Sequence, residues 1–276
     1  PRDYLSTFLK IGTILVLELG ILWVAPDLKM PPLTRFIDGT GPVFAGSLFP
    51  FLFITLACGA VSGFHALVSS GTTPKMIERE SHIRPIGYGG MLMESFVAIM
   101  ALIASCLLDP GIYFSMNSPP AIIGSTVEEA AKVVSSWGFI ITPEALTQLA
   151  NDVGEKTILS RVGGAPTLAV GMAKILSEVF GGQAMMGFWY HFAILFEALF
   201  ILTTLDAGTR VCRFMIQDLL GMFYKPLAQT QSWTANLLAT TLAVSGWGYF
   251  LYQGVIDPLG GINTLWPLFG IANQML

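Results

Sequence analysis

The chain has 276 residues, of which 53% are hydrophobic and only 12% are charged, against roughly 25% charged residues in an average soluble domain. Its mean hydropathy of +0.66 excludes an ordinary soluble fold, and 19 Phe residues with a net charge of −4 exclude a disordered chain. The 14 Lys and Arg residues do not outnumber the 18 Asp and Glu residues, so nucleic acid is not expected as a partner. The composition indicates a chain embedded in a lipid bilayer.

Long apolar runs follow one another along the chain. A bilayer core of about 30 Å needs about 20 mostly apolar helical residues. A sixth run begins near Leu265, and the five complete ones cover residues 5–25, 48–68, 87–108, 184–205 and 237–253. Because a membrane β-barrel would need short alternating segments instead, this pattern predicts an all-α, polytopic membrane helical bundle.

The stretch 109–182 differs from the runs on either side of it. It contains two amphipathic pieces, 127–137 and 143–158, and a weakly apolar helix over 167–180. That helix carries Lys174 and Glu178, so we expect it to be re-entrant or to lie on the membrane surface. Lys and Arg are concentrated in the short loops on one side of the membrane, which include 72–87. Because such loops face the cytoplasm, this bias places 72–87 in the cytoplasm and 117–152 outside the cell.

The second run ends in a cluster of glycine, serine and histidine residues, which is unusual for a helix that faces lipid. Glycine lets a membrane helix unwind, and broken helices build the substrate sites of secondary transporters. The alternative is close helix packing through small residues. His65 is ionisable and lies within the membrane run, which favours the interpretation as a substrate site. The alternative for His65 itself is a hydrogen-bonded histidine in the protein core. The candidate substrate-binding residues are Gly59, Ser62, Gly63, His65, Ser69, Ser70 and Gly71.

A second polar group stands at the end of the fourth run. Thr203, Thr204 and Asp206 offer two hydroxyls and a carboxylate, and oxygen ligands of this kind suit a hard cation such as sodium. The alternative is the solvated cytoplasmic end of a helix, anchored by Arg210 and Arg213.

Motifs of enzymes and pumps are missing from the chain. Its three cysteines and three histidines are scattered, and neither H-E-x-x-H, G-x-S-x-G nor a phosphate-binding G-x-x-x-x-G-K-[ST] loop occurs. We therefore expect no catalytic activity, no metal and no cofactor beyond a coupling proton or sodium ion. A membrane-embedded sensor or enzyme, and a passive channel, remain the alternatives to a secondary transporter.

Three long strings carry a resemblance to a known family. They are GTGPVFAGSLFPFLFITLACGAVSGFHALVSSGTTPKMI, YHFAILFEALFILTTLDAGTRVCRFMIQDLLG and WPLFGIANQML. The chain resembles the carbon starvation protein A (CstA) family of bacterial inner-membrane transporters over essentially its whole length. The resemblance implies uptake of peptides or pyruvate during nutrient starvation by ion-coupled symport. Because the family's proteins are longer, residues 1–276 resemble the central part of one transporter domain, with N-terminal and C-terminal parts missing.

The family is itself similar to transporters with two five-helix inverted repeats. That similarity implies that the first run is the last helix of repeat one, and that the next five form repeat two. It also implies that 59–71 form the substrate site and that 109–182 are a periplasmic gating loop. Thr203, Thr204 and Asp206 would then hold the coupling cation, or Lys10 would take the place of that cation.

Overall fold

The computed structural model describes residues 2–43, 47–49, 56 and 67–256. All regular elements within these ranges are helices, as the apolar runs predict. By length and composition, three helices can cross a membrane, over Tyr4–Val24, Glu80–Cys106 and Gln183–Phe223. The runs at 5–25, 87–108 and 184–205 are thereby confirmed as long apolar helices.

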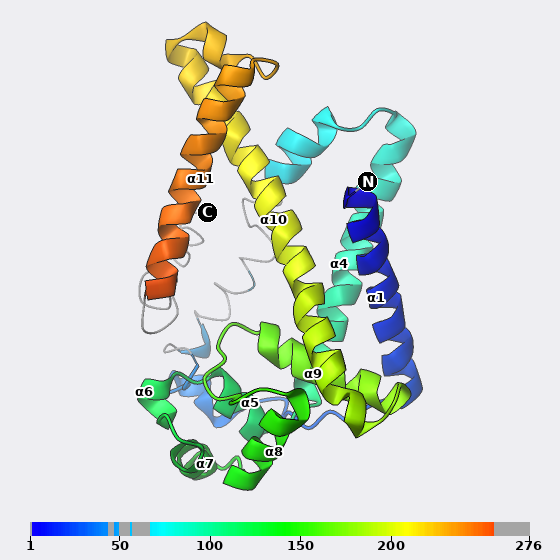
Figure 1. The fold of residues 1–276 in the computed structure, drawn as a ribbon, viewed down its shortest axis with the longest axis vertical. Coiled ribbons are helices and arrows are strands. Elements are labelled where there is room, and N and C mark those ends of the chain that lie inside the picture. The colour runs from blue at the N-terminus through cyan, green and yellow to red at the C-terminus, as the bar shows by residue number, and fades with distance from the viewer. Residues whose placement is uncertain (1, 44–46, 50–55, 57–66, 257–276) are drawn as a thin grey trace. The chain divides into compact units, whose positions relative to one another are not determined.

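The long helices are α1 (Arg2–Val24), α4 (Ile83–Cys106), α10 (Met186–Phe223) and α11 (Trp233–Ile256) (Figure 1). Helix α11 covers the predicted run at 237–253 but is not among the three that meet both criteria for a span. Most of the run at 48–68, and the run beginning near Leu265, lie outside the described residues.

The chain divides into two compact units. The first contains residues 1–48 and 90–200, and the second contains 49–89 and 201–276. Helix α10 therefore contributes to both, and it continues as one α-helix of 38 residues through Gly208. At 1.5 Å per residue its length is about 57 Å, nearly twice the thickness of the hydrocarbon core.

Helix α9 (Ala165–Val179) is the centre of the first unit. Residues 169–173 are all buried, and Ile14 and Leu17 of α1 belong to the same apolar core. Gly171 permits a close crossing with α4, because a Cβ atom at this position would overlap the carbonyl group of Ala104. The sequence predicted a re-entrant or surface helix here, and α9 is not among the three helices that can cross a membrane. The structure shows that this helix is packed in the core of the first unit, and its position relative to the membrane stays a prediction.

Four short helices precede α9. They are α5 (Pro110–Asn117), α6 (Pro120–Ile123), α7 (Val127–Ser136) and α8 (Pro143–Val153). Polar side chains start three of them: Asp109 caps α5, Thr126 caps α7 in a capping box with Glu129, and Thr142 caps α8. The periplasmic position of this stretch stays a prediction.

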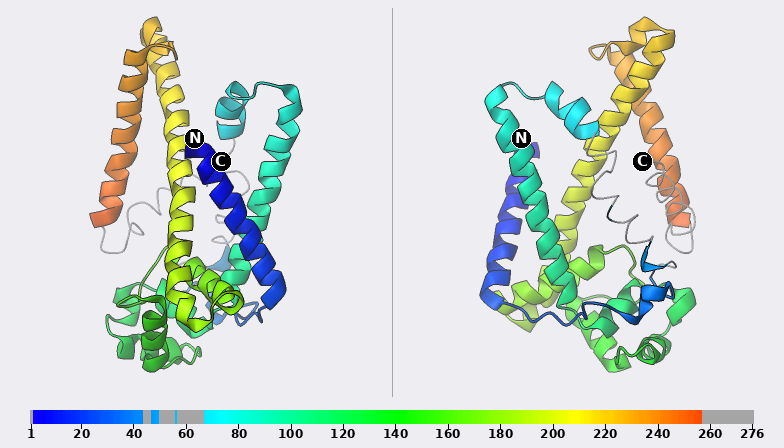
Figure 2. Two further views of the ribbon diagram at one scale, coloured as in Figure 1. Left: turned by 45° about the vertical axis from the view of Figure 1, so that its right-hand side comes forward. Right: turned by 180° about the vertical axis from the view of Figure 1, so that it is seen from behind.

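An aromatic cluster ties the chain after α1 to these short helices. Phe36 of the 3₁₀ helix η1 (Arg35–Asp38) makes edge contacts with Phe114 and Trp137, whose ring centroids lie 5.4 and 5.8 Å away. Figure 2 shows η1 beside this helical cluster. The cluster fixes the path of the chain between α1 and η1 within the first unit.

In the second unit, the 3₁₀ helix η6 (Lys225–Ala228) lies between α10 and α11, which returns alongside the C-terminal half of α10 (Figures 1 and 2). Ala235, Ala239 and Ala243 are buried, and their spacing of four residues puts them on one face of α11. Gln217 of α10 donates a hydrogen bond from Nε2 to Oδ1 of Asn236 at 2.8 Å. A hydrogen bond between two side-chain amides thus joins α10 to the first turn of α11.

Candidate functional site

The predicted substrate segment is described only at its end. Ser69, Ser70 and Gly71 lie in η2 (Val68–Thr72), which has π-helical hydrogen bonding and continues into the 3₁₀ helix η3 (Thr73–Lys75). The backbone here departs from a regular α-helix, and π-helical turns are frequent at functional sites. Gly59, Ser62, Gly63 and His65 lie outside the described residues.

The polar group on α10 includes an ion pair that the sequence analysis did not predict. Arg210 approaches Asp206 with 3.3 Å between Nη2 and Oδ2, the i, i+4 spacing of neighbours on one helix face. The other guanidinium nitrogen, Nη1, lies 3.2 Å from Sδ of Met76. Thr203 and Thr204 precede the pair and are exposed. A cation bound at Asp206 would therefore share the carboxylate with Arg210.

The remaining predicted coupling residue, Lys10, lies on α1. Its ammonium group stands 5.0 Å from the centroid of the Phe200 ring, a cation–π contact within the first unit. Lys10 thus belongs to the first unit, whereas Asp206 belongs to the second. The predicted pairing of Lys10 with Asp206 stays a prediction.

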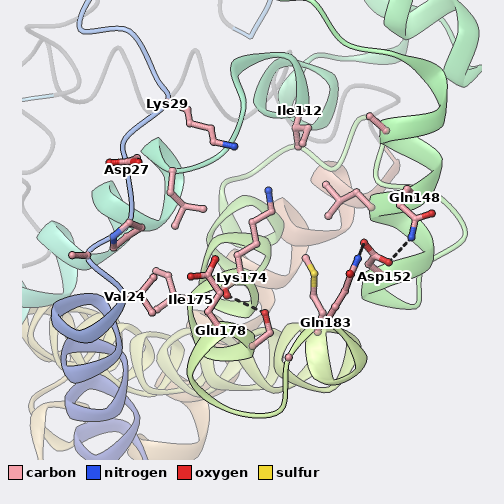
Figure 3. Close-up of a pocket in the computed structure, with 18 residues that line it drawn as sticks. Val24, Asp27, Lys29, Ile112, Gln148, Asp152, Lys174, Ile175, Glu178 and Gln183 are labelled. Carbon is pink, nitrogen blue, oxygen red and sulfur yellow. Dashed lines mark hydrogen bonds between the residues drawn. The ribbon is translucent and has the colours of Figure 1, made fainter.

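The first unit contains a pocket of about 770 Å³ (Figure 3). Its walls come from the chain after α1, from α8 and α9, and from the 3₁₀ helix η5 (Gln183–Met185). Backbone hydrogen bonds from the amides of Lys29 and Met30 to the carbonyl of Cys106, at 2.8 and 3.0 Å, hold the chain after α1 against the end of α4. The pocket therefore has a wall held in place by backbone hydrogen bonds.

Two lysines point their ammonium groups into this pocket, Lys29 from the chain after α1 and Lys174 from α9 (Figure 3). Lys174 is half-buried, and burial lowers the pKa of its amine, with the positive charge of Lys29 acting in the same direction. The carboxylates of Asp109, Glu178 and Asp152 act in the opposite direction. Among the described residues, no carboxylate oxygen lies within 4.0 Å of the Lys174 ammonium.

An acidic group forms another part of the wall. Asp152 accepts a hydrogen bond at each carboxylate oxygen, from Nε2 of Gln148 at 2.7 Å and from Nε2 of Gln183 at 3.0 Å. The two amides fix the orientation of the carboxylate without neutralising its charge. The pocket thus presents positive and negative groups to one small volume.

No pattern in the sequence predicted this pocket. Lys174 and Glu178 indicated only that their helix does not span the membrane, whereas a lysine inside the apolar string GMAKIL is the signal in the sequence that marks the pocket. In the described part of the chain, no group of three or more His, Cys, Asp or Glu side chains is arranged so that it could hold a metal ion.

Comparison with known proteins covers the whole chain. The model of the family described as carbon starvation protein CstA matches residues 1–276. The chain is 69% identical to a peptide transporter CstA of Escherichia coli and 67% identical to one of Campylobacter jejuni, covering 100% of this chain and 40% and 39% of those proteins. It is also 59% identical to the pyruvate/proton symporter BtsT of Escherichia coli, of which it covers 42%. No solved structure matches.

The chain therefore belongs to the carbon starvation protein CstA family, as the resemblance of its three long strings predicted. It spans about 40% of the length of these relatives.

Proposed function

Starting from this family membership, we propose that the chain is the central part of a secondary transporter for a carboxylate-bearing nutrient, a short peptide or pyruvate. The observation that carries the proposal is the similarity over the full chain to proteins named as a peptide transporter and as a pyruvate/proton symporter. Peptides and pyruvate both carry a carboxylate, so a site that binds a carboxylate could accept either substrate. The transport activity belongs to the whole protein.

The proposed setting is the bacterial inner membrane, with the long helices forming part of a five-helix inverted-repeat bundle. Helix α1 would end repeat one. Repeat two would consist of the segment at 48–74, the helices α4, α10 and α11, and the run that begins near Leu265. The stretch 109–182 would be a periplasmic gating loop. Three long apolar helices in this order support the arrangement.

The substrate would contact the small and polar residues of the interrupted helix. The π-helical turn at Val68–Thr72 supports this placement, because unwound backbone leaves amides and carbonyls available to a ligand. The proposed substrate-binding residues are Gly59, Ser62, Gly63, His65, Ser69, Ser70 and Gly71.

We propose the proton as the coupling ion, because the symporter relative is named for it. Thr203, Thr204 and Asp206 would form the coupling site, with Lys10 supplying the positive charge that sodium supplies in other transporters. The Asp206–Arg210 pair supports this version, since a carboxylate already paired with a guanidinium attracts sodium less strongly.

The test is transport by the full-length protein in proteoliposomes. Labelled L-alanyl-L-alanine and pyruvate are supplied outside with an inward proton gradient. We expect accumulation of at least one of them above its external concentration, abolished by a protonophore and unaffected by sodium removal. Equilibration without accumulation would indicate a channel, and absence of both uptake and binding would favour a sensor or enzyme. Gly63→Leu should abolish uptake at normal membrane abundance, whereas retained uptake would support the small-residue packing interpretation.

A further inference from the structure

The pocket between the chain after α1 and helices α8 and α9 has the size of a ligand site. Its volume of about 770 Å³ falls within the range of roughly 300–1,000 Å³ typical of small-molecule sites. Leu107, Ile112 and Leu149 supply apolar walls, and the polar groups are few and convergent. This combination of apolar walls with a few aimed polar groups is typical of sites for small organic molecules.

The positive side of the pocket is suited to a carboxylate. Lys174 extends from a helix whose residues at 171–173 and 175–177 are buried, so its ammonium is partly removed from water. No carboxylate of the described residues pairs with it within 4.0 Å, and the nearby charge of Lys29 adds repulsion. An anion placed between the two ammonium groups would relieve both the repulsion and the desolvation.

The negative side is suited to an amine. Asp152 is held by Gln148 and Gln183, and each of its oxygens retains a lone pair for a further donor. Asp27 and Glu178 add negative charge to the pocket (Figure 3). Pyruvate offers no cationic group to these carboxylates, whereas a short peptide carries a carboxylate at one end and an ammonium at the other.

We propose that this pocket binds a short zwitterionic peptide, with the peptide carboxylate at Lys174 and Lys29 and the peptide ammonium at Asp152. The inference rests on the proposed function and adds to it a second binding site, specific for one of the two proposed substrates. None of the residues that line the pocket belongs to the interrupted helix, and most of them lie in the stretch predicted to face the periplasm. The pocket would therefore be an outer site that captures peptide before the peptide reaches membrane depth.

The experiment measures equilibrium binding to the purified full-length protein by calorimetry. The probes are L-alanyl-L-alanine, its C-terminal amide and its N-acetyl derivative. Lys174→Gln should weaken binding of the dipeptide about 10- to 100-fold, as expected for loss of a hydrogen-bonded ion pair, and should leave binding of the amide within twofold of the wild type. Asp152→Asn should weaken binding of the dipeptide and leave binding of the N-acetyl derivative unchanged.

Two further variants keep the test independent of folding. Lys174→Arg retains the charge and should retain most of the affinity, and Lys132→Gln removes an exposed lysine of α7 outside the pocket and should change nothing. Wild-type affinity in Lys174→Gln, or equal losses for the dipeptide and its amide, would overturn the inference. The inference would also be overturned if anionic lipid, with no other ligand added, displaced the bound dipeptide from the pocket. Concentrative dipeptide uptake with any of these results would leave the proposed function standing.

Discussion

The crossing of α9 and α4 at Gly171 offers a direct test of the packing in the first unit. A Cβ atom at residue 171 would lie 2.6 Å from the carbonyl carbon of Ala104 and 2.9 Å from its Cβ. Carbon atoms pack best at about 3.5–4.0 Å, so Gly171→Ala must push the two helices apart by about 1 Å. Overpacking of this kind costs about 1–3 kcal/mol, and the better helix propensity of alanine returns up to about 1 kcal/mol.

We therefore expect Gly171→Ala to destabilise the full-length protein by about 1–2 kcal/mol. The measurement is the temperature at which half of the detergent-solubilised protein loses its monodisperse peak in size-exclusion chromatography. Gly90→Ala is the matched control, because Gly90 lies on α4 with nothing within 4 Å of an added Cβ among the described residues. A midpoint for Gly171→Ala equal to or above that of Gly90→Ala would refute the close crossing.

Three further predictions concern transport, ligand binding and orientation. Asp206→Asn should lower the accumulation ratio of substrate in proteoliposomes, and Lys10→Met should do the same if the two residues act as a pair; full accumulation by Asp206→Asn would return this carboxylate to the role of a helix end. Affinity for the N-acetyl derivative of the dipeptide, which has no amine of its own to titrate, should fall as pH rises through the lowered pKa of Lys174, because only the charged form of Lys174 attracts the carboxylate. The fall should occur at lower pH than for an ordinary lysine, and Lys174→Arg should remove it in calorimetry repeated from neutral to alkaline pH, since a guanidinium stays charged; an identical pH profile in this variant would count against the assignment. In intact cells, an impermeant thiol reagent should label Ser136→Cys and miss Ser81→Cys, both exposed positions, and the reverse pattern would invert the proposed topology.

Local sequence accounts for most of the helices in the described part of the chain. Apolar runs of about 20 residues predicted α1, α4 and α10, because backbone groups in lipid must be satisfied within the segment. The short helices α7 and α8 lie where the amphipathic pieces were predicted, and Thr126 and Thr142 begin them as N-caps. The family could also be recognised from sequence, since long unusual strings carry far more information than composition.

The candidate sites divide differently between sequence and structure. The polarity of Ser69, Asp206 and Lys10 could be read from the chain, because a polar group in an apolar run is conspicuous wherever it points. The Asp206–Arg210 pair could also have been read, since both members lie one turn apart on the same helix.

Only the tertiary structure revealed the pocket at Lys174. Its walls come from segments at 24–29, 107–112, 145–152 and 174–186, and no local pattern states that these meet. The same holds for Gly171, whose lack of a side chain matters only because the Ala104 carbonyl lies across the helix crossing. Hydropathy along a chain determines which segments enter an apolar phase, since that depends on each segment's own side chains. Which side chains then face one another depends on helix crossings between distant segments, and these are decided by packing.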